Sequence, residues 1–276
     1  MVRLAPALAG CAWLALAAFQ PSYEDEIVQW RRDREARLRA DDGWLTVAGL
    51  FWLHPGANSF GTAAGAAIVL PDGPAQAGVF NFDGRRVTVT RNGATREVQP
   101  DSDADRVKVG RLSLFVIRRG DRFGIRLKDP ESSYRRQFHG LEYFPASPAW
   151  RVKARWVAAG KKIPILNVLG QTELSECPGY AEFDLGGKRL RLYPILESPG
   201  YQELFYIFRD QTAGKETYGA GRFLYSDMPR DGWVVLDFNK AYNPPCSFTP
   251  YATCPLPPAE NRLAVRIEAG EKNYGH

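Results

Sequence analysis

Histidine is scarce in this chain, with three in 276 residues, and cysteine is nearly as scarce, with four. Zinc sites usually take several Cys or His ligands at short spacing. Neither His54 nor His139 has a second histidine within a few residues, and the third, His276, ends the chain. We therefore interpret these side chains as ordinary loop histidines, and we expect no metal site and no cofactor.

Several sequence motifs of common enzyme classes are also missing. The chain has no Gly-x-Ser-x-Gly, no P-loop and no Gly-x-Gly-x-x-Gly, so hydrolase-elbow, NTPase and dinucleotide-binding interpretations have no support. The formal net charge is +5, but lysines and arginines are scattered rather than clustered, which does not indicate nucleic acid. Arg151, Lys153 and Arg155 alternate along one predicted strand, as on the wet side of a sheet.

Hydrophobic runs are short. The longest, Leu4 to Phe19, follows a single basic residue, Arg3, and falls short of the roughly 20 residues that a membrane-spanning helix needs. With Ala15-Leu16-Ala17 as a cleavage signal, residues 1–18 are predicted to be an export signal, which places the mature protein in the periplasm or outside the cell. The competing interpretation is a lipoprotein acylated at Cys11, because Leu8-Ala9-Gly10-Cys11 spells a lipobox. We expect no membrane span in the rest of the chain.

The rest of the chain reads as one helix followed by strands. Residues 22–40 are predicted to be helical, with Ser22 and Asp25 as a capping box and Trp30 as the anchor on the protein body. Short β-rich runs over 44–53, 66–70, 78–82, 86–90, 109–118 and 123–127 predict a sandwich spanning 41–130. The break at Asp129–Ser133 separates it from a second β domain over 134–276.

The second domain has its own strand signals. Predicted strands cover 150–157, 180–185, 188–193, 204–208, 221–225, 233–238 and 263–267. Gly186-Gly187 between two alternating runs indicates a hairpin, because primed turns need positive φ. The predicted fold is thus all-β with one N-terminal helix, a first β-sandwich and a second β-sandwich or barrel-like domain.

Two long stretches carry a family resemblance. One stretch is WRRDREARLRADDGWLTVAGLFWLHPGANSFG (30–61). The other is C-terminal and contains RDQTAGKETYGAGRFLY and DFNKAYNPPCSFTPYATCPLPPAENRLAVRIEAGEK. Both resemble the DUF1684 family of uncharacterised bacterial and archaeal proteins. The similarity runs from about residue 24 to the end. It implies a two-part β-rich protein whose most distinctive residues lie in the second part, and it implies no activity.

A second resemblance concerns the first domain. GANSFGTAAGAAIVLPDG (56–73) is similar to the opening of forkhead-associated domains, which are β-sandwiches that bind phosphothreonine. The family's arginine is Thr62 here, and its Asn-Asp pair is Ala66-Ala67. Because a phosphate needs charge-assisted donors, the resemblance implies the sandwich, and we expect no phosphopeptide binding.

The stretch DFNKAYNPPCSFTPYATCPLPP (237–258) holds two cysteines, Cys246 and Cys254. We predict a disulfide, which exported proteins retain, and which leaves Cys177 as the free thiol. Reduced structural thiols, a reactive thiolate beside Lys240, and a metal clip stay open as alternatives.

Candidate site residues gather in two segments of the second domain. Glycine-rich 214–225 offers Glu216, Tyr218 and Arg222 as a pocket rim, although a surface bulge would give the same pattern. The proline-fixed loop beyond Asp237 offers side chains that donate, accept and stack; its members are Asn239, Tyr242, Asn243 and Tyr251. The sequence thus predicts an exported protein that binds a small polar or sugar-like ligand. The alternative is a hydrolase or transferase that uses Glu216, Asp237 or a cysteine of 237–262.

Overall fold

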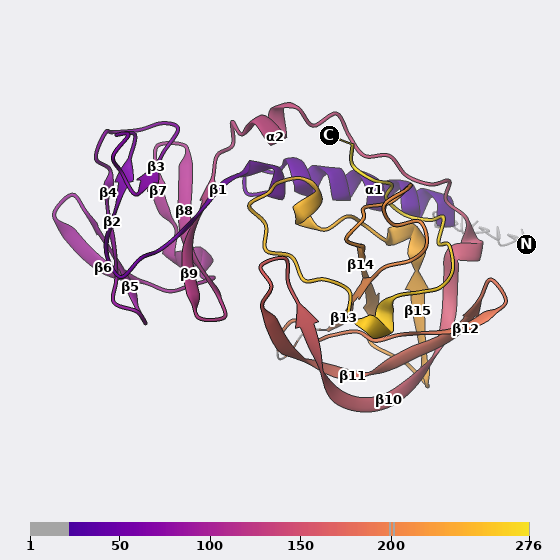
Figure 1. Cartoon of the computed structure of the whole chain (residues 1–276). Coiled ribbons are helices and arrows are strands. Elements are labelled where there is room, and N and C mark those ends of the chain that lie inside the picture. The colour runs from indigo at the N-terminus through magenta and orange to yellow at the C-terminus, as the bar shows by residue number, and fades with distance from the viewer. Residues whose placement is uncertain (1–21, 199, 201, 276) are drawn as a thin grey trace, which may run out of the picture.

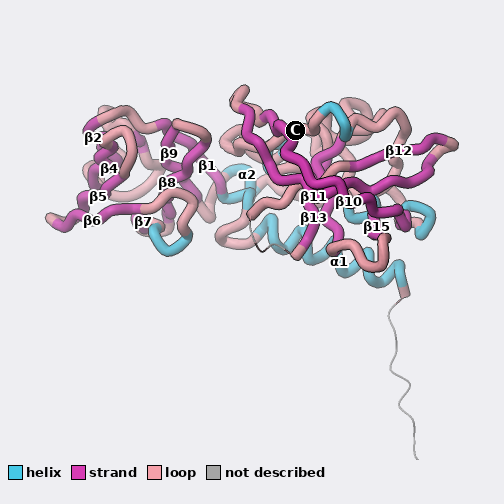
Figure 2. Tube along the Cα trace, turned by 90° about the horizontal axis from the view of Figure 1, so that it is seen from below, coloured by secondary structure: helices cyan, strands magenta, loops and turns pink. Residues whose placement is uncertain are grey.

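Two β-rich lobes lie side by side, and the N-terminal helix runs along the second lobe (Figures 1 and 2). The structure is a computed structural model that describes residues 22–198, 200 and 202–275. The predicted export signal 1–18 and the lipobox cysteine Cys11 lie outside these residues. The prediction of an all-β fold with one N-terminal helix is confirmed.

The first lobe consists of two antiparallel-dominated sheets. One sheet has the strand order β1-β9-β8-β7 and the other β3-β2-β4-β5-β6. The strands are β1 (Val47–Trp52), β2 (Gly56–Gly61), β3 (Ile68–Val69), β4 (Gly78–Phe82), β5 (Val87–Arg91), β6 (Ala94–Val98), β7 (Val107–Val109), β8 (Leu112–Arg119) and β9 (Arg122–Lys128).

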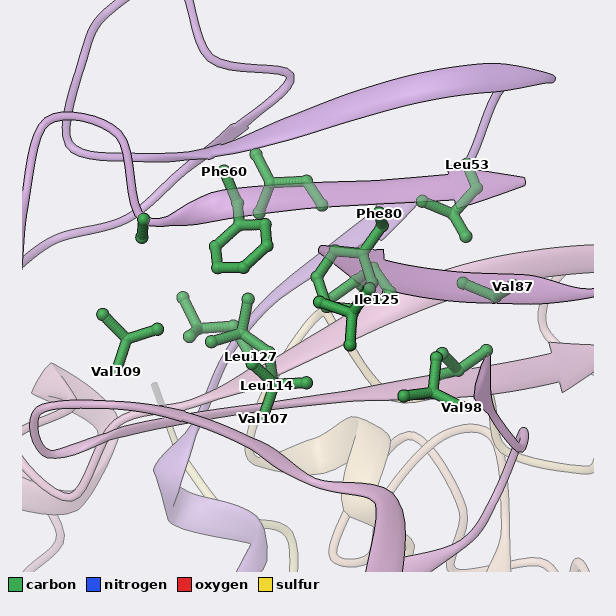
Figure 3. Packing of buried hydrophobic residues seen from close by; sticks show 14 of the residues in the cluster. Leu53, Phe60, Phe80, Val87, Val98, Val107, Val109, Leu114, Ile125 and Leu127 are labelled. Carbon is green, nitrogen blue, oxygen red and sulfur yellow. The ribbon is translucent and has the colours of Figure 1, made fainter. Parts of the chain in front are cut away.

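One hydrophobic core holds these two sheets together. Alternate residues of each strand point inward, as the period of two requires, so Phe60 and Phe80 from one sheet meet Leu114 and Ile125 from the other (Figure 3). The lobe is therefore a β-sandwich, as predicted. Its likeness to forkhead-associated domains in particular, and the absence of phosphopeptide binding, stay predictions.

The second lobe contains a four-stranded sheet of order β12-β11-β10-β15 and a two-stranded sheet of β13 and β14. Its strands are β10 (Arg151–Leu166), β11 (Thr172–Leu185), β12 (Lys188–Leu192), β13 (Glu203–Phe208), β14 (Arg222–Asp227) and β15 (Trp233–Asp237). The short helices of the chain are α2 (Ser133–Arg136), η1 (Trp44–Thr46), η2 (Asp103–Asp105), η3 (Pro148–Trp150), η4 (Phe238–Lys240), η5 (Pro245–Ser247) and η6 (Ala259–Asn261).

The β13–β14 sheet has two different faces. Leu204, Tyr206 and Leu224 point into the core shared with the four-stranded sheet. The residues that alternate with them, including Phe205 and Phe223, belong to a separate cluster on the opposite face. This opposite face looks toward the N-terminal helix, and it becomes one wall of the site below.

The helix α1 (Tyr23–Arg39) begins with the predicted capping box, in which Ser22 and Asp25 each bond the other's backbone N–H. Its buried residues are Ile27, Arg34 and Leu38, a stripe on one helical face. Trp30 is only half-buried, so the prediction that Trp30 anchors the helix is wrong. The apolar members Ile27 and Leu38 were predicted for this stripe, whereas Arg34 was not, because charged residues are rarely fully buried.

Most predicted strands are present, and two differences have clear causes. The Gly186-Gly187 hairpin is confirmed, with φ of 58° and 72°. Residues 263–267 form no strand: their side chains alternate between buried and exposed, but their backbone pairs with the 209–211 segment through single bonds rather than a ladder. β10 and β11 extend far beyond the predicted 150–157 and 180–185, because glycine, proline and polar residues in the added parts, 158–166 and 172–179, hide the strand pattern. The described strands form no closed barrel.

Among the residues that the structure describes, no helix combines the length and apolar character needed to cross a membrane. The division into two independently folding domains at 129–133 stays a prediction.

Candidate functional site

A cavity of about 910 Å³ lies between α1 and the β13–β14 sheet. Segments far apart in the sequence line it: α1, the start of the sandwich, the end of β8, both strands of the small sheet, and the loop around the two cysteines. The aromatic members of the lining are Trp30, Trp44, Phe205, Phe223, Tyr225 and Tyr242.

Four of these aromatic rings form a continuous wall. Phe205 and Tyr225 are cross-strand partners in β13 and β14, and their rings stack with centroids 4.8 Å apart. Tyr225 also stacks on Tyr242, with centroids 6.2 Å apart and planes within 12°. Phe223 meets Phe205 and Tyr242 edge-on. Such contacts fix ring positions, so the wall is preformed.

Polar groups are placed along this aromatic wall. The Tyr225 hydroxyl donates to Glu197 Oε2 at 2.7 Å. Burial, followed by the neighbouring Tyr242 phenol and Glu197 carboxylate, raises the pKa of Tyr225 far above its usual range. Burial likewise raises the pKa of Tyr242. Both phenols therefore stay protonated at physiological pH and serve as hydrogen-bonding groups rather than bases.

Two more carboxylates lie at the end of the same sheet face. Glu203 and Asp227 are direct cross-strand partners, and both line the cavity. Facing side chains in antiparallel pairs have Cβ atoms about 4.5–5.5 Å apart, so two negative charges meet here. The cavity thus has an acidic end on β13–β14.

Cations line other parts of the cavity. Arg34 lies over the Tyr242 ring, with its guanidinium carbon 4.6 Å from the centroid. Its Nε donates to Glu271 Oε1 at 2.8 Å and its Nη2 to the Asn243 carbonyl at 3.0 Å. Arg37 and Arg119 also line the cavity. Arg34 is therefore fixed by the protein, and it holds the aromatic wall against α1.

Of the residues predicted for the site, Asp237 and Tyr242 line the cavity. Asp237 Oδ1 accepts from the Tyr23 hydroxyl at 2.8 Å, from the Asn239 backbone at 3.2 Å and from the Asn239 side chain at 3.1 Å. Its Oδ2 is buried and has no hydrogen-bond partner in the described part of the chain. Burial and Asp237 together raise the pKa of Tyr23, which keeps the Tyr23 proton on this bond.

Glu216, Tyr218 and Arg222 do not come together as one rim. Glu216 pairs with Arg266, whose Nη2 lies 2.6 Å from its Oε1. The Tyr218 hydroxyl donates to the Cys246 carbonyl at 3.3 Å. Arg222 is only 1% exposed; it pairs with Asp210 at 3.3 Å and also donates to backbone carbonyls. None of the three is among the residues that line the cavity.

Asn239, Asn243 and Tyr251 also lie outside the lining. Asn239 is fully buried and bonds both backbone groups of Ser147. The Asn243 side chain donates to the Lys272 carbonyl at 2.7 Å. Tyr251 packs edge-on against Tyr134, with centroids 6.4 Å apart. These contacts order the loop and the C-terminal tail behind the cavity.

The predicted disulfide is confirmed. Cys246 and Cys254 are bonded, with Cα atoms 6.2 Å apart, inside the usual range of about 4.4–6.8 Å. Cys177 is the free cysteine of the described residues and is buried. No group of three or more potential ligands in the described chain could hold a metal ion. Cys254 lies in the cavity lining, so the bridge shapes part of the wall.

Sequence reasoning missed most of the cavity lining. Phe223 and Tyr225 lie in the predicted strand 221–225, and Phe205 lies in 204–208, so their shared face could be anticipated. The sequence held no signal that Arg34 or Glu197 would meet this face, because that depends on how distant segments pack. Arg222 was predicted at a pocket rim rather than in the core, because charged residues are rarely fully buried.

The geometry defines a two-lobed β protein with an aromatic-walled cavity in its second lobe. The family model of the protein of unknown function DUF1684 matches residues 136–272. A solution NMR structure of an uncharacterized protein from Haloarcula marismortui is 33% identical to this chain, covering 50% of this chain and 78% of that protein, with a TM-score of 0.43. This chain belongs to the DUF1684 family. Among curated proteins, none matches the chain.

The matched range places the family relationship on the second lobe. Residues 136–272 include Phe205, Tyr225 and Tyr242 of the aromatic wall. The helix α1 and the sandwich precede this range, although both contribute to the cavity lining.

Proposed function

We propose that this protein binds a small polar ligand with a flat face, such as a sugar ring, in the cavity between α1 and the β13–β14 sheet. The observation that carries the proposal is the stacked wall of Phe205, Tyr225 and Tyr242, with Glu197 bonded at its edge. Small-molecule pockets combine aromatic walls with a few fixed polar groups. The volume of about 910 Å³ suits a ligand of one or two rings.

The polar groups at the wall are complementary to hydroxyl-rich ligands. Carboxylates such as Glu197, Glu203 and Asp227 accept from ligand hydroxyls, and charge strengthens such bonds. The protonated phenols of Tyr225 and Tyr242 donate or accept as needed. A sugar ring presents hydroxyls at its rim and an apolar face, so it can use both kinds of contact at once.

Binding is favoured over the enzyme alternative by the state of the candidate catalytic groups. The disulfide removes Cys246 and Cys254 as thiolate nucleophiles. Glu216 is engaged with Arg266 away from the cavity lining. Asp237 is the predicted acid that does line the cavity, and its Oδ1 already accepts three hydrogen bonds.

We further propose that the protein works outside the cytoplasm. The support is the N-terminal apolar run 4–19 in the sequence. The disulfide is compatible with this location, because disulfides persist in oxidising compartments.

Titration calorimetry with a panel of neutral and acidic monosaccharides tests the binding proposal. We expect at least one sugar to bind, and Tyr225→Leu to weaken it about tenfold, because an aromatic pair contributes about 0.5–1.5 kcal/mol beyond its buried area. Tyr218→Leu is the matched control: it also removes a ring and a hydroxyl bond, but outside the cavity lining. Equal weakening by both variants, or no sugar bound at all, would contradict the proposal.

A further inference from the structure

A buried arginine of the sandwich, next to the cavity lining, has no carboxylate partner among the described residues. Arg126 of β9 is 5% exposed. Its Nε is buried without a hydrogen-bond partner in the described chain, and its Nη2 donates to Thr253 Oγ1 at 3.3 Å. Its guanidinium carbon lies 5.1 Å from the ring centre of Trp44, a cavity-lining residue.

Another cation lies beside Arg126 on the cavity side. Arg119 lines the cavity, donates from Nε to the same Thr253 oxygen at 2.9 Å, and pairs with Asp101 at 3.1 Å. Burial lowers the pKa of Arg126 the most, and the charge of Arg119 lowers it further, to about 10. The charge of Asp101 raises the pKa and so acts in the opposite direction. Arg126 thus remains charged at neutral pH with its charge incompletely compensated.

Thr253 links both arginines to the cavity. Its side chain is in the lining and is 9% exposed. A hydroxyl has two acceptor sites and one hydrogen to donate. Arg119 and Arg126 occupy both acceptor sites, which leaves the hydroxyl hydrogen for an acceptor in the cavity.

A third cation, Arg37, lines the cavity from the C-terminal end of α1. Arg37 lies in the last turn of α1, beside the sandwich in Figure 1, and it lines the cavity. Its side chain makes no hydrogen bond or ion pair with any described residue. Arg37, Arg119, Arg126 and Thr253 are called the oxyanion end below.

A buried cation is costly unless an anion compensates it, and arginine is suited to carboxylate and phosphate oxygens. We propose that the ligand is an acidic sugar, a uronic acid or a sugar phosphate, whose anionic group binds at the oxyanion end. The group accepts from the Thr253 hydroxyl and pairs with Arg37 and Arg119 in the field of Arg126. The sugar ring then lies against the aromatic wall. This inference rests on the proposed function and names the class of its ligand.

Calorimetric titrations with glucuronate, glucose 6-phosphate and glucose test the inference. We expect at least one of the two acids to bind ten-fold or more tightly than glucose. If glucose binds as tightly as both acids, the oxyanion end is overturned, while the proposed sugar binding stands. If none of the three, nor any other sugar, binds, the proposed function fails, and this inference fails with it.

Three variants locate the anionic group. Thr253→Val should reduce the affinity for the tighter acid ten-fold or more, and Thr253→Ser, which keeps the hydroxyl, should largely restore it. Arg126→Met should weaken the acid but not glucose, without lowering the melting temperature, because it removes an incompletely paired buried charge. Arg85→Met removes an exposed charge of the sandwich and should change nothing. Unchanged acid affinity in both Thr253→Val and Arg126→Met would overturn the inference.

Discussion

Arg34 of α1 and Glu271 near the C-terminus form a buried ion pair, with Arg34 Nε 2.8 Å from Glu271 Oε1. Glu271 is 0% exposed, and its Oε2 accepts from the Asn243 backbone at 2.7 Å. This pair joins the first and last parts of the described chain across the second lobe. It also holds Arg34 over Tyr242, so the helix and the cavity wall depend on it together.

Replacing Arg34 by methionine leaves Glu271 buried without its cation. Breaking a buried pair in this way costs about 3–5 kcal/mol, and we expect a loss of this size in the free energy of unfolding at pH 8. Urea denaturation measures it. Arg189→Met, which removes an exposed partner of Asp184, should cost under about 1 kcal/mol.

The same variant should respond to pH in a defined direction. Burial raises the pKa of Glu271 above its ordinary value of 4.5, although Arg34 opposes this. The folded state therefore holds the Glu271 proton more tightly than the unfolded state, so this group makes the protein less stable as pH rises from about 4.5 through the folded pKa. Without Arg34 the rise in pKa is larger. We expect the deficit of Arg34→Met to be smaller at pH 5 than at pH 8, and an equal deficit at both would contradict this account.

Gly221 should tolerate no side chain. Its φ is +107°, and an added Cβ would lie 2.5 Å from the Phe208 carbonyl oxygen and 2.7 Å from Pro257 Cγ. Strained backbone alone costs about 1–3 kcal/mol, so Gly221→Ala should lower the unfolding free energy by at least that amount in urea denaturation. Gly219→Ala is the control, because its Cβ would meet nothing closer than 3.7 Å. Similar effects in both variants would contradict the strain argument.

Thiol counting tests the cysteine assignment. In protein that begins at Ala18 or Phe19, denatured but not reduced, we expect one reactive thiol, Cys177. In the native protein we expect none, because Cys177 is 1% exposed, burial raises its pKa, and its Sγ donates to the Gly179 carbonyl at 3.1 Å. Three thiols in the denatured, non-reduced sample would reject the bridge in solution.

Export can be checked on protein from the native host. We expect N-terminal sequencing to begin near Ala18 or Phe19, since the apolar run 4–19 ends there. An acylated Cys11 would support the lipoprotein alternative instead. An intact Met1 in the cytoplasm would contradict export.

Local chemistry made much of the fold predictable. The Ser22 capping box, the Gly186-Gly187 hairpin and the Cys246–Cys254 bridge each depend on a few neighbouring residues, and each is confirmed. The strand predicted over 263–267 is wrong. The apolar alternation of this segment reflects burial against the core, whereas a strand also needs a partner backbone in register.

The cavity was harder to predict than the fold. Period-two alternation put Phe223 and Tyr225 on one face, but it cannot distinguish a core face from a cavity wall. Glu216 and Arg222 looked like a polar rim among glycines, whereas each has a different, distant partner in Arg266 and Asp210. Such long-range pairs leave no local trace in a single sequence.

Tryptophan indole N–H signals in NMR spectra test the central claim, ligand binding in this cavity, most directly. Trp30 and Trp44 line the cavity, whereas Trp52 and Trp233 do not. On titration with the tightest-binding sugar, the account predicts shifts of the Trp30 and Trp44 signals, assigned by substitution, while those of Trp52 and Trp233 stay in place. Saturable binding that moves Trp52 or Trp233 and leaves Trp30 and Trp44 unchanged would contradict it.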